Sequence, residues 1–238
     1  MRLYYDLHIH SCLSPCGDDD MTPNNIVGMA KLCGYDIIAL TDHNTCKNCP
    51  AIVEVGKNNG LTVVPGMELC TSEEIHVVCL FATVEEALNF SDYVEKNSPP
   101  IENKPQIFGN QLIMDEDDNV IGQVDNLLTL ASFISIDDVY EVVTSFGGVC
   151  YPAHLNRESY SIISVLGEFT NDNEYPAAEF SDLTQLELYK ERYPALKEKE
   201  IITSSDAHYL ENMRDAQFQI DLPENSAQAL IEYFRRKI

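Results

Sequence analysis

The chain has 238 residues, of which 45% are hydrophobic, and this length suits one large domain over residues 1–238. The formal net charge of −24 disfavours extended contact with a nucleic-acid backbone. No apolar run reaches the roughly 18 residues that cross a membrane. The first residues carry no basic stretch and no apolar leader, so we expect a cytoplasmic protein without a membrane partner, its cysteines reduced.

Short apolar runs alternate with helix-like segments along most of the chain. The expected strands are 3–9, 36–41, 62–65, 75–82, 148–152, 177–180 and 201–204. The expected helices are 23–33, 49–59, 85–97, 136–146, 159–167 and 183–193. Thr22 and Pro23 are typical of a helix start, and Gly34 and Gly60 of helix ends. The alternation indicates α/β units, a parallel sheet and a closed or nearly closed barrel.

The segment 98–135 breaks this rhythm. Residues 111–114 and 120–123 flank the acidic turn 115–119. We therefore expect a β-hairpin insertion whose acidic turn is solvated, and which could cover the cleft of the barrel.

The six histidines follow or interrupt short apolar runs. They are His8, His10, His43, His76, His154 and His208. Because strand residues two apart point to the same side, His8 and His10 can reach one metal ion, and Asp6 can orient a ligand from that side. Taken alone, each motif also fits ordinary core histidines.

Two acidic residues join this pattern at the ends of expected strands. Glu68 follows 62–65, and Asp206 lies two residues before His208. An acidic residue is costly to bury unless a cation accompanies it. Together these positions predict several metal ions at one end of the sheet, and hence a hydrolytic enzyme.

The order of these motifs resembles the PHP family (polymerase and histidinol phosphatase domain). The chain has an HxH motif near its start, Thr41-Asp42-His43, a later lone His154, and Asp206-x-His208. The resemblance covers nearly the whole length. It implies a distorted (β/α)7 TIM-like barrel that holds a trinuclear metal centre.

The resemblance also assigns ligands to three divalent ions. The first ion takes His8, His10, Glu68 and Asp206; the second shares Glu68 and adds His76 and His154; the third takes His43, His208 and Asp18. Asp18 is counted back from Pro23, and because Asp19 stands where the family often has glycine, Asp19 and Asp20 stay open as the loop ligand. This donor set suits Mn²⁺, Fe²⁺ or Zn²⁺.

The reaction implied is metal-assisted hydrolysis of a phosphate ester. Arg157, three residues after His154, is the candidate for binding phosphate, since a guanidinium contacts two phosphate oxygens at once. A surface salt bridge is the plain alternative for Arg157. Lys47 and Arg214 are weaker candidates.

We expect a phosphoesterase acting on a small metabolite, a nucleotide or the end of a short oligonucleotide. Histidinol-phosphate phosphatase is the alternative enzyme. A metal- or phosphometabolite-binding regulator without turnover and a C–N hydrolase are alternatives of other classes. The oligomeric state stays open.

Overall fold

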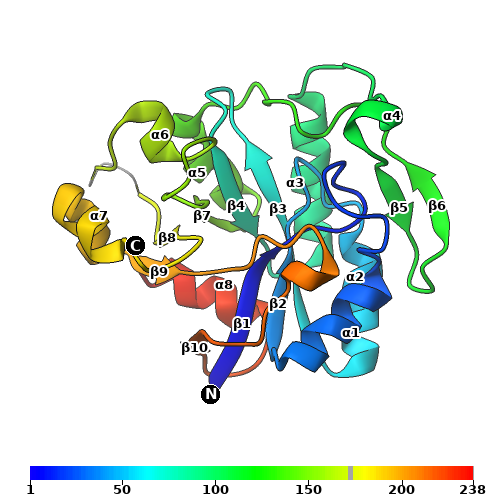
Figure 1. Ribbon diagram of the computed structural model, residues 1–238, viewed down its shortest axis with the longest axis horizontal. Coiled ribbons are helices and arrows are strands. Elements are labelled where there is room, and N and C mark those ends of the chain that lie inside the picture. Colours follow the sequence, from blue (N-terminus) through cyan, green and yellow to red (C-terminus); the bar gives the residue numbers. More distant parts are fainter. Residues whose placement is uncertain (171–173, 238) are drawn as a thin grey trace.

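A strongly curled sheet forms the centre of the computed structural model, which describes residues 1–170 and 174–237 (Figure 1). Its strand order is β10-β1-β2-β3-β4-β7, and the pair β8-β9 lies beside β7. The strands are β1 (Arg2–Ile9), β2 (Ile37–Leu40), β3 (Thr62–Cys70), β4 (His76–Leu80), β7 (Val149–Pro152), β8 (Ala177–Glu179), β9 (Glu200–Ile202) and β10 (Gln219–Asp221).

The sheet is mixed rather than parallel throughout. β1, β2 and β3 run parallel, whereas β4 is antiparallel to both β3 and β7. This corrects the expected parallel sheet, and the reason is the connection: segment 71–75 is too short for the crossover that parallel neighbours need. His76 therefore begins β4, at the same edge where β3 ends, instead of following a strand.

Backbone contacts bring the two ends of the curl toward each other. Ile9 forms a parallel bridge with Ala207, just after β9, and the Leu155 amide donates to the Glu179 carbonyl at 2.8 Å. The fold is thus a mixed α/β fold with a curled, half-barrel sheet. The finer (β/α)7 count stays a prediction.

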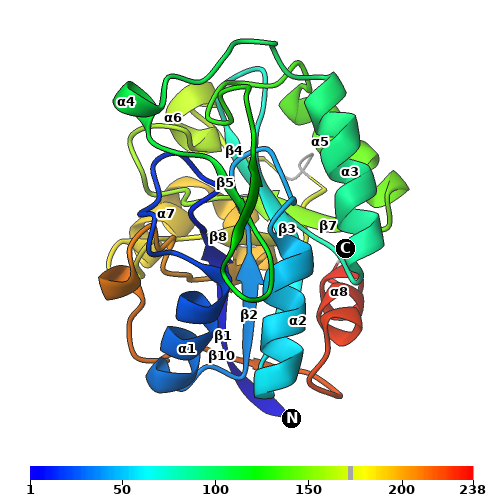
Figure 2. The ribbon, with the colours of Figure 1, turned by 90° about the vertical axis from the view of Figure 1, so that its right-hand side faces the viewer.

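Helices surround this sheet (Figures 1 and 2). They are α1 (Pro23–Cys33), α2 (Cys49–Asn59), α3 (Val84–Lys96), α4 (Pro105–Phe108), α5 (Ile136–Ser145), α6 (Ile162–Leu166), α7 (Leu186–Arg192) and α8 (Ala227–Arg235). α1 and α2 have the predicted bounds, and both end at glycines in the left-handed conformation, Gly34 and Gly60. None of the helices in the described residues is long and apolar enough to cross a membrane.

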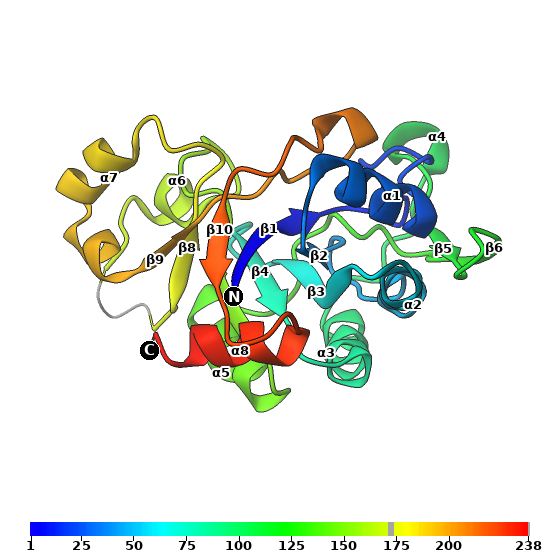
Figure 3. The ribbon, with the colours of Figure 1, turned by 90° about the horizontal axis from the view of Figure 1, so that it is seen from below.

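Two apolar clusters lie on opposite faces of the sheet. One packs α1, α2, α3 and α5 against its outer face. The other fills the concave face, where Leu230 and Phe234 of α8 pack with Tyr151 and other strand residues. Seen from below in Figure 3, α8 lies beneath the strands, near the N-terminus. The concave end opposite α8 is left for polar side chains.

A register shift in β1 decides where its polar residues point. Asp6 pairs with Ile38 and Ile9 pairs with Leu40, so β1 has one residue more than β2 between these pairs. Leu7 belongs to the concave cluster but Ile9 to the outer one. The bulge therefore separates Asp6 from the face that carries the HxH histidines, which corrects the expectation that Asp6 shares their side.

The expected hairpin is present as β5 (Leu112–Met114) and β6 (Val120–Gln123), which pair antiparallel. We expect from the sequence that its acidic turn is only solvated, and this is wrong, because the turn contacts the start of α1. The Asp118 carboxylate accepts hydrogen bonds from the Thr22 hydroxyl at 2.7 Å and the Asn24 amide at 3.1 Å. The Met114 amide donates to the Asn48 side chain at 2.9 Å. The hairpin is thus attached to the N-terminal ends of α1 and α2.

Candidate metal centre

Glu68 lies at the centre of a group of histidines. Its carboxylate is 1% exposed and has no lysine or arginine partner among the described residues. Five imidazole nitrogens surround it, on His76 at 2.9 Å, His43 at 3.0 Å, His8 and His154 at 3.2 Å each, and His10 at 3.4 Å. One carboxylate therefore contacts ligands predicted for all three ions.

Polar partners behind His8 and His10 fix both rings. The Nδ1 of His8 hydrogen-bonds both oxygens of Glu179, at 3.0 and 3.1 Å. The Nδ1 of His10 lies 2.9 Å from the Ser14 hydroxyl, which donates to Asp42 at 2.7 Å. These bonds turn the Nε2 atom of each ring toward the centre.

The two Nε2 atoms, of His8 and His10, are 3.1 Å apart. Two nitrogens that share one tetrahedral zinc ion at about 2.1 Å are about 3.4 Å apart. The observed separation therefore fits two ligands of one ion.

Asp206 connects the histidines to a cation. Its Oδ1 lies 3.2 Å from His10 Nε2 and 3.4 Å from His8 Nε2, while its Oδ2 lies 2.6 Å from the Arg157 guanidinium. His208 Nδ1 is 3.6 Å from Oδ1. Asp206 and Arg157 also line a cavity of about 120 Å³ with His43, Glu68, His76, His154, Ser159, Tyr160 and His208.

Two buried ligand atoms at the centre have close neighbours but no hydrogen bond of standard geometry. They are His43 Nδ1, 3.0 Å from Glu68, and Asp206 Oδ1, 3.2 Å from His10 Nε2. Three groups of side chains bring their ligand atoms within 4.8 Å of one another: His8, His10, Glu68 and Asp206; His43, Glu68 and His76; and His10, His43 and His208. Buried acids and imidazoles grouped in this way fit divalent cations better than they fit each other.

The ionisable groups of this centre shift one another's pKa values in different directions. Burial raises the pKa of Glu68, but His76, His8 and His43 outweigh it and hold that pKa well below its usual value. Burial together with His208 and His43 lowers the pKa of His10. Against the effect of burial, Glu68 raises the pKa of His43 to about 10. A metal ion binding here must therefore displace a proton from His43.

The backbone is strained at two predicted ligands. His154 has φ 30° and Asp206 has φ 50°, a region that non-glycine residues seldom adopt. Such strain persists where the surrounding structure enforces it, and it is concentrated at functional sites.

The loop before α1 supplies a residue that the sequence analysis missed. Although partial burial raises the pKa of the Cys16 thiol, the nearby His208 and His43 rings outweigh it and lower that pKa to about 6. Cys16 itself belongs to none of the three ligand groups. Asp18 belongs to none of the three ligand groups, and its Oδ1 accepts from the Asp20 amide at 2.9 Å. The position of Cys16 in the same loop was the signal available in the sequence.

The two cationic candidates differ in their contacts. Arg157 contacts the centre through its ion pair with Asp206, whereas the Lys47 ammonium is paired with the Glu95 carboxylate at 3.0 Å. Glu179, which orients His8, was not singled out from the sequence, because a Glu within an apolar strand carries no motif of its own. Tyr160 stacks on His76 with ring centroids 4.6 Å apart.

Comparison with known proteins places this geometry in context. The family model for the PHP domain matches residues 6–234. The chain is 34% identical over 100 residues to the uncharacterized protein MJ1587 of Methanocaldococcus jannaschii, covering 38% of this chain and 58% of that protein. It is 34% identical over 83 residues to a 5'-3' exoribonuclease of Haemophilus influenzae, covering 34% of this chain and 29% of the enzyme. The chain thus matches less than two thirds of either relative's length.

Solved structures share the fold at low sequence identity. The lesion-specific endonuclease EndoQ of Pyrococcus furiosus superimposes with a TM-score of 0.69 at 17% identity, over 99% of this chain and 56% of that chain. A proposed metal-dependent phosphoesterase from Bifidobacterium adolescentis gives a TM-score of 0.58 at 15% identity, over 97% and 96% of the two chains. Because the family model spans nearly the whole sequence and the predicted ligands converge around Glu68, this chain belongs to the PHP domain family, a family of metal-dependent hydrolases.

Proposed function

We propose that this protein is a metal-dependent phosphoesterase that hydrolyses a phosphate ester of a small metabolite, a nucleotide or a short oligonucleotide end. The observation that carries the proposal is the buried Glu68 carboxylate with five imidazoles at 2.9–3.4 Å. A single domain over residues 1–238, a (β/α)7 barrel and a cytoplasmic location are part of the same proposal.

Three divalent ions would be divided among the converging side chains. The first would be held by His8, His10, Glu68 and Asp206, the second by Glu68, His76 and His154, and the third by His43, His208 and a residue of the loop 16–20. When bound, such ions lower the pKa of water and neutralise the charge that develops on phosphate oxygens. The donor set accepts Mn²⁺, Fe²⁺ or Zn²⁺.

The protein's own groups would position the ester. Arg157 is 45% exposed and is held at one end by Asp206, so its other N–H groups are free to bind phosphate oxygens at the mouth of the small cavity. Hydrogen bonds to Glu179 and Ser14 already fix the rings of His8 and His10. The site is therefore organised on folding, and its side chains need not rearrange during the reaction.

Relatives suggest the substrate class. One curated relative is a 5'-3' exoribonuclease, and a structural neighbour is an endonuclease specific for lesions. The net charge of −24 disfavours a long duplex, so we infer a mononucleotide or a short oligonucleotide end.

The test is phosphate release from protein stripped with chelator and reloaded with Mn²⁺, Fe²⁺ or Zn²⁺. The panel contains mononucleotides, nucleoside 3',5'-bisphosphates, short RNA and DNA oligomers and histidinol phosphate, and ammonia release from amides is measured in parallel. Chelator-sensitive turnover of a nucleotide or oligonucleotide supports the proposal. Turnover of histidinol phosphate alone contradicts the nucleotide substrate class in favour of the alternative phosphatase. Ammonia release alone, or metal binding without turnover, contradicts the phosphoesterase function itself.

A further inference from the structure

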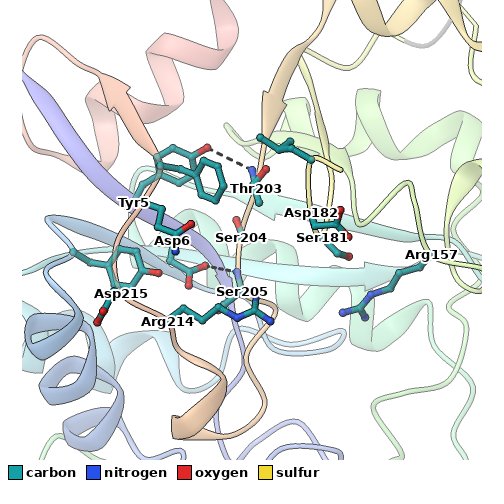
Figure 4. Close-up of a pocket in the computed structure, with 14 residues that line it drawn as sticks. Tyr5, Asp6, Arg157, Ser181, Asp182, Thr203, Ser204, Ser205, Arg214 and Asp215 are labelled. Carbon is teal, nitrogen blue, oxygen red and sulfur yellow. Dashed lines mark hydrogen bonds between the residues drawn. The ribbon is translucent and has the colours of Figure 1, made fainter. Parts of the chain in front are cut away.

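A second, larger cavity lies beside the metal centre, on the other side of Arg157. Its volume is about 340 Å³, and Arg157 lines both cavities. Its lining includes Asp6, Tyr35, Ser181, Ser205, Arg214 and Phe218 (Figure 4). The volume falls in the range of small-molecule sites, about 300–1,000 Å³.

Asp6 is the buried acid of this cavity. It is 1% exposed, and its Oδ1 accepts from the Ser205 amide at 3.1 Å and the His8 amide at 3.4 Å. Its Oδ2 makes no hydrogen bond of standard geometry in the described structure, although the Ser205 and Tyr35 hydroxyls lie near the carboxylate. Leaving a buried acceptor unpaired costs about 1–3 kcal/mol, more if charged, so this oxygen is suited to a donor supplied by a ligand.

Further polar atoms around Asp6 are also unpaired. The buried Ser181 hydroxyl has no hydrogen-bond partner among the described residues, and the buried Ser205 hydroxyl lies near Asp6 without a hydrogen bond of standard geometry. Arg214 lines the cavity, where Figure 4 shows it below Ser205, and it forms no ion pair within residues 1–170 and 174–237. Tyr35 and Phe218 add aromatic surface.

This combination favours a particular ligand. A carboxylate accepts from sugar hydroxyls or base N–H groups, as the acidic residue of dinucleotide sites does with ribose. Aromatic rings and arginine guanidinium groups stack on nucleobases, and all bases have a flat face that permits this. The adjoining centre suits phosphate, and Arg157 stands between the two cavities.

We propose that this cavity binds the nucleoside part of a nucleotide ester whose phosphate lies at the metal centre. Asp6 and the two serine hydroxyls take the hydrogen-bonding groups of the nucleoside, and Arg214 with the aromatic side chains holds the base. The proposal rests on the phosphoesterase function proposed above and narrows its substrate to nucleotides.

The first test is binding without phosphate, which needs no turnover. Saturation-transfer NMR is recorded with adenosine, guanosine, cytidine, uridine and free ribose on the wild-type protein and the variants Arg214→Ala and Asp6→Asn. Arg236→Ala is the matched control, because Arg236 is a surface arginine paired with Glu232. We expect saturation of base and ribose protons in the wild type and the control, and at least tenfold weaker binding in both cavity variants.

The kinetic test compares a mononucleotide with phenyl phosphate. The ratio of their kcat/KM values should fall about tenfold in Arg214→Ala and stay unchanged in Arg236→Ala. The proposal is overturned if no nucleoside binds, or if Arg214→Ala binds nucleosides as well as the wild type does. It is also overturned if saturation transfer to free ribose equals that to nucleosides and none reaches the base protons. Hydrolysis of both esters with an unaltered ratio refutes the cavity assignment alone, whereas nucleoside binding without hydrolysis of either ester refutes the phosphoesterase function alone.

Discussion

Glu179 accepts a hydrogen bond from His8 Nδ1 with both of its carboxylate oxygens, although 171 positions separate the two residues. Glu179 is completely buried at the end of β8 and His8 near the end of β1, so the pair connects the two ends of the curled sheet. A carboxylate behind a metal-binding imidazole fixes the ring orientation and raises its basicity.

Replacing Glu179 by Gln should therefore weaken metal binding about 10- to 100-fold. The amide keeps the size of the side chain but removes the negative charge behind His8. Metal affinity would be measured by competition with a fluorescent chelator, and circular dichroism would confirm the fold. Glu187→Gln, on an exposed residue of α7, is the control. Unchanged affinity in Glu179→Gln would show that His8 needs no orienting acid.

His43→Ala should remove the third ion and most of the activity while leaving the fold intact. His43 is a member of two of the three ligand groups, and its Nδ1 lies 3.0 Å from the Glu68 carboxylate. The number of metal ions per chain should fall from about three to about two, as measured by inductively coupled plasma mass spectrometry. A variant that retains both full metal content and full activity contradicts the assignment of His43.

Two loop variants decide which residue completes the third site. The rings of His43 and His208 lower the pKa of the nearby Cys16 thiol, whereas the Asp18 carboxylate accepts from the Asp20 amide. We expect Cys16→Ser to lose about one ion per chain and Asp18→Asn to lose none. In Co²⁺-loaded protein, the thiolate-to-cobalt absorption band should disappear only in Cys16→Ser. The opposite pattern would return the ligand role to Asp18.

Asp6→Asn should stabilise the metal-free protein at neutral pH. Burial raises the pKa of Asp6 to about 6, above the value of about 3.9 for an unfolded chain. Between these values the native state binds more protons than the unfolded state, so stability falls as pH rises through about 4 to 6. The charged carboxylate then costs about 3 kcal/mol above pH 6.

Urea unfolding at about pH 7.5 and pH 4.5 tests this. The free energy of unfolding should be higher in Asp6→Asn than in the wild type at pH 7.5, and the difference should shrink toward pH 4.5. A gain of the same size at both pH values would mean that the charge of Asp6 is not its cause.

Much of the site could be predicted because its signals are local. The predicted helix bounds of α1 and α2 match the structure since proline in the first turn and glycine in the left-handed conformation mark their ends. His8, His10, His43, His154 and His208 converge on Glu68 and Asp206 from the ends of strands, as the sequence predicted, and His76 joins them from the start of β4.

Other features depend on contacts between distant segments. Nothing near Glu179 in the sequence indicates that it meets His8. β10 pairs with β1 from the far end of the chain through three residue pairs, too few for a local pattern. α8 is different, because Ser226 caps it and an apolar face was available to predict it.

The bulge in β1 has a consequence for how this protein can change during evolution. With one residue too many between Asp6 and Ile9, the strand presents Asp6 to the larger cavity and His8 to Glu68 at the metal centre. A one-residue deletion in this stretch would restore ordinary pairing and exchange inward and outward side chains on one side of it. Point substitutions at Asp6 or His8 can alter the larger cavity or the metal centre separately, whereas a single-codon deletion would disturb both at once.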